Sequence, residues 1–187
     1  MRLLGRCLLA VAMLIMASCA VWANEPDGEY LYAPPFQVGQ RFLVVQGFDG
    51  ERSHTTPLSR YAVDLAIPEG EPVCAARSGV ISDLYDGDDE SISHFVHIEH
   101  EDQTLSDYEH LQKSSITVKV GQAIKQGDCF ARVGNTGNST GAHLHFAVLH
   151  RQGFLLQVFV SKPFRFLGKT NGIIPEYLTW IENPVVK

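Results

Sequence analysis

Short apolar runs separated by glycine- or proline-containing turns make up most of the chain after residue 35. In several of these runs apolar and polar residues alternate, which is the pattern of a strand with one buried face. No stretch between residues 36 and 168 repeats its apolar residues with the 3.6-residue period of a helix. This rhythm predicts an all-β domain over residues 36–168, an antiparallel β-sheet sandwich or open barrel. The main runs lie at 41–45, 61–67, 72–76, 79–84, 95–100, 104–110, 129–133 and 142–149.

The first 23 residues differ from the rest and are predicted to be a signal peptide. Two arginines precede an almost unbroken apolar run over residues 7–17, about the length of a signal-peptide core. The run is too short for a membrane span, which needs roughly 20 apolar residues. We expect cleavage after Ala23. An alternative is a lipobox at residues 16–19, in which Cys19 would carry a lipid anchor.

Two further segments flank the predicted domain. Residues 24–35 are polar and contain prolines, and we expect a linker or arm there. Residues 169–187 form a C-terminal extension to which the sequence assigns no role. Within it, residues 176–181 would form at most one short helix, so few or no helices are expected outside the signal peptide.

Charge and cysteine content narrow the class of protein. The formal net charge of −6 becomes more negative when the two arginines of the signal peptide are removed, and nucleic-acid binding usually needs a basic patch. No later segment is apolar enough to span a bilayer. After cleavage at Ala23 the remaining cysteines are Cys74 and Cys129, which in an exported domain predict a disulfide; two buried thiols are the alternative.

The triplet His143-Leu144-His145 is the strongest chemical signal in the chain. In a strand, residues i and i+2 point to the same face, so the two imidazoles emerge side by side, roughly 6.6 Å apart along the strand. This spacing suits one histidine on a metal ion and the other beside the water that the metal binds. Leu144 points the opposite way, into the core.

A glycine-rich loop at residues 134–141 precedes this triplet. Phosphate-binding loops need a helix N-terminus after their glycines, whereas here a strand follows and no Gly-Lys-Ser/Thr closes the loop. We therefore interpret it as a tight loop that brings the backbone close to a substrate.

Three motifs, in this order, resemble those of the M23 metallopeptidases, the lysostaphin-like peptidoglycan endopeptidases. The resemblance covers roughly residues 36–168 and implies the lysostaphin-like peptidase fold. The motifs are Tyr61-Ala62-Val63-Asp64 with the segment up to Val80, Tyr108-Glu109-His110-Leu111, and Val133-Gly134-Asn135-Thr136-Gly137 through His143-Leu144-His145-Phe146.

The resemblance assigns roles residue by residue. Asp64 and His145 match the metal ligands of the family, and His110 and His143 match its two catalytic histidines that do not bind the metal. The chain departs from the commonest pattern four residues before Asp64, where a histidine ligand usually stands. Arg60 occupies that position, and arginine cannot ligate zinc because it only donates. We take His54 as the third ligand; the alternative is a domain without metal.

This ligand set predicts one zinc ion with a fourth position open to water. The resemblance implies a zinc metalloendopeptidase that hydrolyses peptide crosslinks of bacterial peptidoglycan through a metal-bound water. His110 and His143 would share the roles of base and oxyanion stabiliser, which the sequence does not divide between them. The alternative from another class is a metal-deficient M23-like binding module that regulates cell-wall amidases.

The predicted partners are peptidoglycan stem peptides and their crosslinks, and the predicted location is the periplasm or the exterior, with a lipoprotein as the variant. A crosslink between D-alanine and a diamino acid is the default substrate, and a glycine bridge is the alternative. Activity alone and activity under a partner's control both stay open.

Overall fold

The computed structural model describes residues 30–153, 158–168 and 172–185. These residues form thirteen strands and no helix, and the prediction of an all-β fold is confirmed. The predicted signal peptide and Cys19 lie outside the described residues. The strands are β1 Tyr30–Tyr32, β2 Arg41–Gln46, β3 Val63–Leu65, β4 Pro72–Cys74, β5 Gly79–Tyr85, β6 Phe95–Glu99, β7 Thr104–Glu109, β8 Ala123–Ile124, β9 Cys129–Arg132, β10 Leu144–Gln152, β11 Val158–Ser161, β12 Phe164–Phe166 and β13 Trp180–Glu182.

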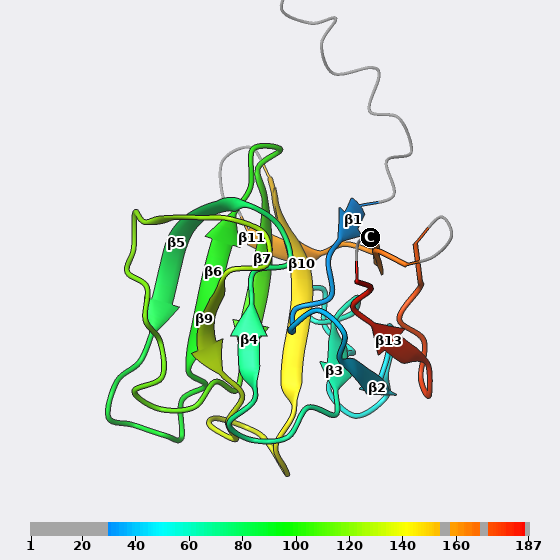
Figure 1. Ribbon diagram of the computed structural model, residues 1–187, viewed down its shortest axis with the longest axis horizontal. Coiled ribbons are helices and arrows are strands. Elements are labelled where there is room, and N and C mark those ends of the chain that lie inside the picture. Colours follow the sequence, from blue (N-terminus) through cyan, green and yellow to red (C-terminus); the bar gives the residue numbers. More distant parts are fainter. Residues whose placement is uncertain (1–29, 154–157, 169–171, 186–187) are drawn as a thin grey trace, which may run out of the picture.

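One large antiparallel sheet organises the molecule. Its strand order is β13-β2-β3-β10-β7-β6-β5-β8, and β11 pairs with the far end of β10. The longest strand, β10, lies in the middle of the sheet and pairs with both β3 and β7 (Figure 1). His145 lies in β10 and His143 directly precedes this strand, so the central position of β10 puts the triplet next to residues from distant parts of the chain.

The two faces of the large sheet have different characters. Leu144, Phe146 and Val148 alternate along β10 and are buried in the core, whereas His145 points to the opposite face. The short pair β4–β9 covers the core face: the Phe130 ring packs edge-on against Tyr108 at a centroid distance of 5.1 Å. The apolar face is therefore covered by a second layer. The other face carries the polar side chains around His145 and a small apolar cluster of Ala62, Leu105, Ala147 and Leu149.

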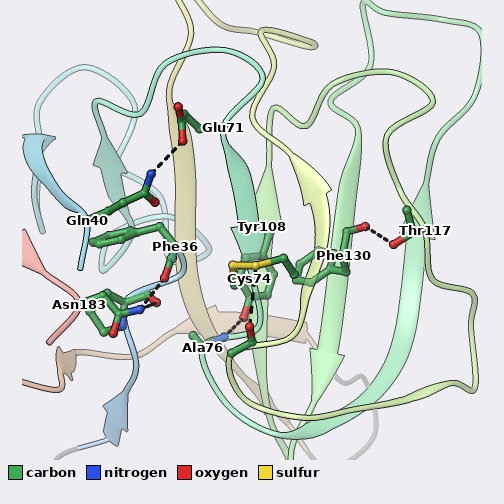
Figure 2. The surroundings of a disulfide bond; sticks show 12 residues. Phe36, Gln40, Glu71, Cys74, Ala76, Tyr108, Thr117, Phe130 and Asn183 are labelled. Carbon is green, nitrogen blue, oxygen red and sulfur yellow. Dashed lines mark hydrogen bonds between the residues drawn. A yellow bond between two sulfur atoms is a disulfide. The ribbon is translucent and has the colours of Figure 1, made fainter. Parts of the chain in front are cut away.

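A disulfide joins Cys74 of β4 to Cys129 of β9 (Figure 2), and the predicted pairing is confirmed. Next to it the Tyr108 hydroxyl accepts a hydrogen bond of 2.8 Å from the backbone N–H of Ala76. The disulfide thus joins the two strands of the covering layer, and the hydrogen bond to Tyr108 ties this layer to the large sheet.

Loss of this disulfide is expected to reduce stability. The Cys74→Ser/Cys129→Ser double variant should unfold with a free energy lower by roughly 2–4 kcal/mol, because the bridge closes a long loop in the unfolded chain. Urea denaturation of the oxidised protein and of the variant measures the difference. Wild type under reducing conditions should behave like the variant, and an unchanged midpoint in both would contradict the expectation.

Both ends of the predicted domain differ from expectation. The predicted arm ends in β1, which pairs with β12, and Tyr32 is fully buried in the core. At the other end, residues 176–181 form a turn and strand β13 instead of a short helix, because this stretch pairs along β2. Six residues gain less as an isolated helical turn than as a sheet edge with its backbone groups paired. No helix in the described part is long and apolar enough to cross a membrane.

Candidate metal centre

A row of four polar residues crosses the large sheet on its outer face. Gln46 of β2 lies opposite Asp64 of β3, Asp64 lies opposite His145 of β10, and His145 lies opposite Glu109 of β7. Paired residues in antiparallel strands project to the same side, so strand register alone brings these side chains together. Asp64 and His145, which are far apart in the sequence, become direct neighbours in this way.

Three predicted ligands converge in this row. Asp64 Oδ1 lies 2.9 Å from His145 Nδ1 and 3.2 Å from His54 Nε2. The ligand atoms of all three residues lie within 4.8 Å of one another. Three nitrogen and oxygen donors at this spacing are the set that a catalytic zinc site uses, with one position left open.

His54 reaches the site from the turn between β2 and β3. Its ring is almost completely buried, and Nδ1 lies 2.8 Å from the carbonyl oxygen of Gly47. A carbonyl only accepts, so Nδ1 carries the proton and Nε2 presents its lone pair to Asp64. Arg60, in the place where related sequences have a histidine, is exposed and pairs with Asp49 instead.

The protonation of these side chains shows whether the three donors fit a cation. The His54 Nε2 lone pair and the Asp64 carboxylate face each other at 3.2 Å, and two acceptors at that distance need a proton or a cation between them. Burial raises the pKa of Asp64, but its close contacts with His145 and His54 outweigh burial and hold that pKa well below its usual range. A charged carboxylate and imidazole nitrogens around one point fit a divalent metal ion.

A second group of possible donors shares His145. Asp107, Glu109 and His145 also offer atoms within 4.8 Å of one another. Neither carboxylate lines the cavity beside the first group, which has a volume of about 460 Å³ and is bordered by Asp64, His110, His143 and His145. A substrate therefore has access to the first group, and we take His54, Asp64 and His145 as the candidate centre.

His110 and His143 lie beside this centre without joining it. Their ring centroids are 4.6 Å apart, and His143 Nε2 lies 3.7 Å from Asp64 Oδ1. His143 Nδ1 donates to the Gly141 carbonyl at 2.8 Å, and His110 Nδ1 donates to the Thr136 carbonyl at 2.8 Å. Each ring thus keeps Nε2 as its free nitrogen. The structure brings together all five side chains that the sequence singled out.

His110 is held in an uncommon backbone conformation. Its φ of 61° lies in the left-handed region, which residues with a side chain rarely adopt. The Ser93 hydroxyl accepts its backbone N–H at 2.9 Å, and Gly137 packs so closely on Ser93 that a Cβ there would come within 2.7 Å. Burial, followed by the neighbouring charge of His143, lowers the pKa of His110 to about 4, so its imidazole is neutral near pH 7.

Three supporting residues escaped the sequence analysis: Gln46, Ser93 and Thr136. Gln46 donates to Asp64 Oδ2 at 2.9 Å and to the Ser53 hydroxyl at 2.8 Å, so both carboxylate oxygens of Asp64 are engaged. The available signal for Gln46 was a polar residue at the end of an apolar strand. Ser93 and Thr136 lie in loops, and no local pattern distinguishes them from other loop residues.

Gln46→Ala is expected to weaken metal binding about 10- to 100-fold, because partners that orient a metal ligand contribute on that scale. Competition with a chromogenic zinc chelator measures the affinity. Gln40→Ala is the matched control, since Gln40 bonds Glu71 outside the cavity. Equal affinity of the two variants would show that Gln46 does not orient Asp64.

The large sheet, the β4–β9 pair that covers it and the histidine–carboxylate centre define a class, a metallopeptidase domain of the lysostaphin type. The chain belongs to peptidase family M23, whose family model matches residues 59–155. Asp64, His110, His143 and His145 lie inside this match, and His54 lies just before it.

Two of the curated relatives come from Vibrio cholerae serotype O1. The peptidoglycan DD-endopeptidase ShyA is 31% identical over 121 residues, which are 62% of this chain and 27% of ShyA. The peptidoglycan DD-endopeptidase ShyB is 35% identical over 115 residues, 58% of this chain and 25% of ShyB. The chain thus spans about a quarter of the length of these relatives.

Two solved structures have a similar fold. A zinc-containing peptidase from Vibrio cholerae gives a TM-score of 0.50 at 30% identity, covering 63% of this chain and 36% of that one. A mutant catalytic domain of the prophage-encoded M23 protein EnpA from Enterococcus faecalis gives 0.50 at 28% identity, covering 67% of this chain and 92% of that one. The latter overlap extends over almost a whole catalytic domain.

Proposed function

We propose that the chain is a zinc metalloendopeptidase that binds one ion and hydrolyses peptide crosslinks of bacterial peptidoglycan. One observation carries the proposal: three donors converge, two of them (Asp64 and His145) border an open cavity, and two further histidines at that cavity keep a free nitrogen. His54, Asp64 and His145 would hold the ion. When bound, zinc supplies Lewis acidity, which polarises a carbonyl and makes water acidic near neutral pH.

The chain's own residues supply the proton transfers. His110 is neutral near pH 7 because its pKa is lowered by burial and by His143, so its Nε2 accepts a proton. His143 lies close to Asp64; with a proton on Nε2 as well, its ring would stabilise negative charge that develops on the substrate. Thr136 and Gly141 hold the two rings through their backbone carbonyls, so the free nitrogens keep their direction.

The substrate class rests on the relatives. ShyA and ShyB are named as DD-endopeptidases of peptidoglycan. Peptidoglycan lies outside the cytoplasm, so the proposal requires export, either to the periplasm or as a lipoprotein anchored at Cys19. The disulfide between Cys74 and Cys129 supports an oxidising compartment.

Digestion of purified sacculi tests the proposal. The zinc-loaded protein should release soluble fragments and convert crosslinked muropeptide dimers to monomers, whereas the protein treated with a chelator should not. Mass spectrometry of the native protein counts the bound ions. A protein that carries zinc yet leaves the dimers intact would contradict the peptidase assignment.

The alternative, a metal-deficient module that regulates amidases, makes a different prediction. It requires a broken donor set, whereas His54, Asp64 and His145 form a complete one. If the purified protein retains no zinc and stimulates an amidase on sacculi, the regulatory reading replaces the enzymatic one.

A further inference from the structure

A second cavity of about 410 Å³ lies next to the candidate metal centre. It adjoins the first cavity, since Val45, Gln46 and Arg52 border both. Its other walls come from the turn after β2, up to Arg52, and from residues 175–177 of the C-terminal extension. Every lining residue therefore lies outside residues 59–155, the part that matches the family model.

The C-terminal extension is firmly seated in this position. Strand β13 pairs with β2, and the backbone N–H of Leu178 donates to the Val44 carbonyl at 2.9 Å. A Cβ on Gly47 would come within 2.9 Å of the Pro175 carbonyl oxygen, so the extension packs directly on the turn. The C-terminal extension is thus a fixed wall of the second cavity. This cavity lies beside the cavity of the metal centre.

The walls of this second cavity are partly apolar and partly charged. Val45, Phe48, Pro175 and Tyr177 supply an apolar surface, and Tyr177 is 65% exposed. The charged residues Glu51, Arg52 and Glu176 are all exposed at the same cavity. Within the described part of the chain, Arg52 makes no ion pair or hydrogen bond, so its guanidinium is free to bind a ligand.

We propose that this second cavity is a specificity subsite for a zwitterionic side chain, the free end of a diamino acid that carries both a carboxylate and an ammonium group. The proposal rests on the proposed function and names the substrate residue that precedes the D-alanine of the cleaved bond. Arg52 would bind the carboxylate, Glu51 and Glu176 would bind the ammonium group, and the apolar wall would contact the methylene chain. A lysine side chain offers only half of this match, since it has no carboxylate.

Binding to a non-cleaving protein tests the subsite. The probes are two synthetic D-alanine-crosslinked peptides that differ only in the residue before that D-alanine, diaminopimelate in one and lysine in the other. Calorimetry uses the zinc-loaded His110→Ala variant of the full chain. Adding Arg52→Gln should lower the affinity for the diaminopimelate peptide about 10- to 100-fold, because one charge-assisted contact is lost. The affinity for the lysine peptide should change by no more than about twofold.

Two further variants separate the charges. The double variant Glu51→Gln/Glu176→Gln should lower the affinity for both peptides equally, since each peptide carries the ammonium group. Arg60→Gln is the matched control: Arg60 is exposed on the same turn, pairs with Asp49 and lines neither cavity. An Arg52→Gln variant that weakens both peptides alike, or neither, overturns the proposal, as does equal binding of the two peptides before any change at Arg52.

Hydrolysis by the otherwise wild-type enzyme distinguishes failure of the subsite from failure of the proposed function. With both correct, Arg52→Gln raises KM for the diaminopimelate peptide and leaves kcat unchanged. If neither peptide is cut but the binding difference persists, the peptidase assignment fails and the subsite stands. If both are cut with equal KM before and after Arg52→Gln, the subsite fails and the peptidase assignment stands.

Discussion

Asp64→Ala is expected to abolish both zinc binding and hydrolysis, and His54→Ala and His145→Ala should do the same. Each change removes one of three donors, and the loss in affinity should exceed the roughly 10- to 100-fold that an orienting partner contributes. Asp64 should have the largest effect, since it supplies the negative charge and contacts both histidines. Zinc content by mass spectrometry, together with cleavage of muropeptide dimers, measures both losses.

The His54→Ala variant allows a sharper test, because it asks which part of the chain supplies the third ligand. In the double variant His54→Ala/Arg60→His the new histidine occupies the position usual in related sequences. It should not restore zinc binding, since the Arg60 side chain is exposed and directed to Asp49. Restored binding would mean that the turn rearranges and that His54 is replaceable. Cooperative urea unfolding of each variant controls for loss of fold.

The strands and the central residues were predictable because their signals are local. Alternation of buried and partly buried residues marks β6, and the His-x-His spacing places His145 in β10 with His143 directly before it. Strand register then explains the contact between the two segments: once β3 and β10 pair, Asp64 and His145 must be neighbours.

The edges and the supporting residues depend on contacts between distant segments, which no local pattern reports. Residues 180–182 form strand β13 because β2 offers an unpaired edge. Gln46 matters only because Asp64 lies opposite it, and Ser93 only because the backbone of His110 turns toward it. Arg52 has an ordinary surface sequence context, and its place between two cavities follows from how the C-terminal extension docks.

His110→Ala is expected to lower kcat about 10²- to 10⁴-fold while zinc stays bound, because general-base catalysis contributes on that scale. His110 holds no donor position in the metal group, so the zinc content should equal that of wild type. This outcome separates His110 from the ligands, whose loss removes zinc and activity together. Loss of zinc in His110→Ala would instead make His110 part of the metal site.

The lowered pKa of His110 also makes the stability of the fold depend on pH. In the zinc-free protein the folded state binds this proton only near pH 4, whereas the unfolded chain binds it near the ordinary value of 6.5. The unfolded state therefore gains protons first, and folding loses stability as pH falls from about 6.5 to about 4. His110→Asn cannot titrate, so the free energy of unfolding of wild type relative to this variant should fall by roughly 1–3 kcal/mol between pH 7 and pH 4.5. Urea denaturation at the two pH values measures this difference, and a constant difference would mean that His110 titrates normally and is not held as a neutral base.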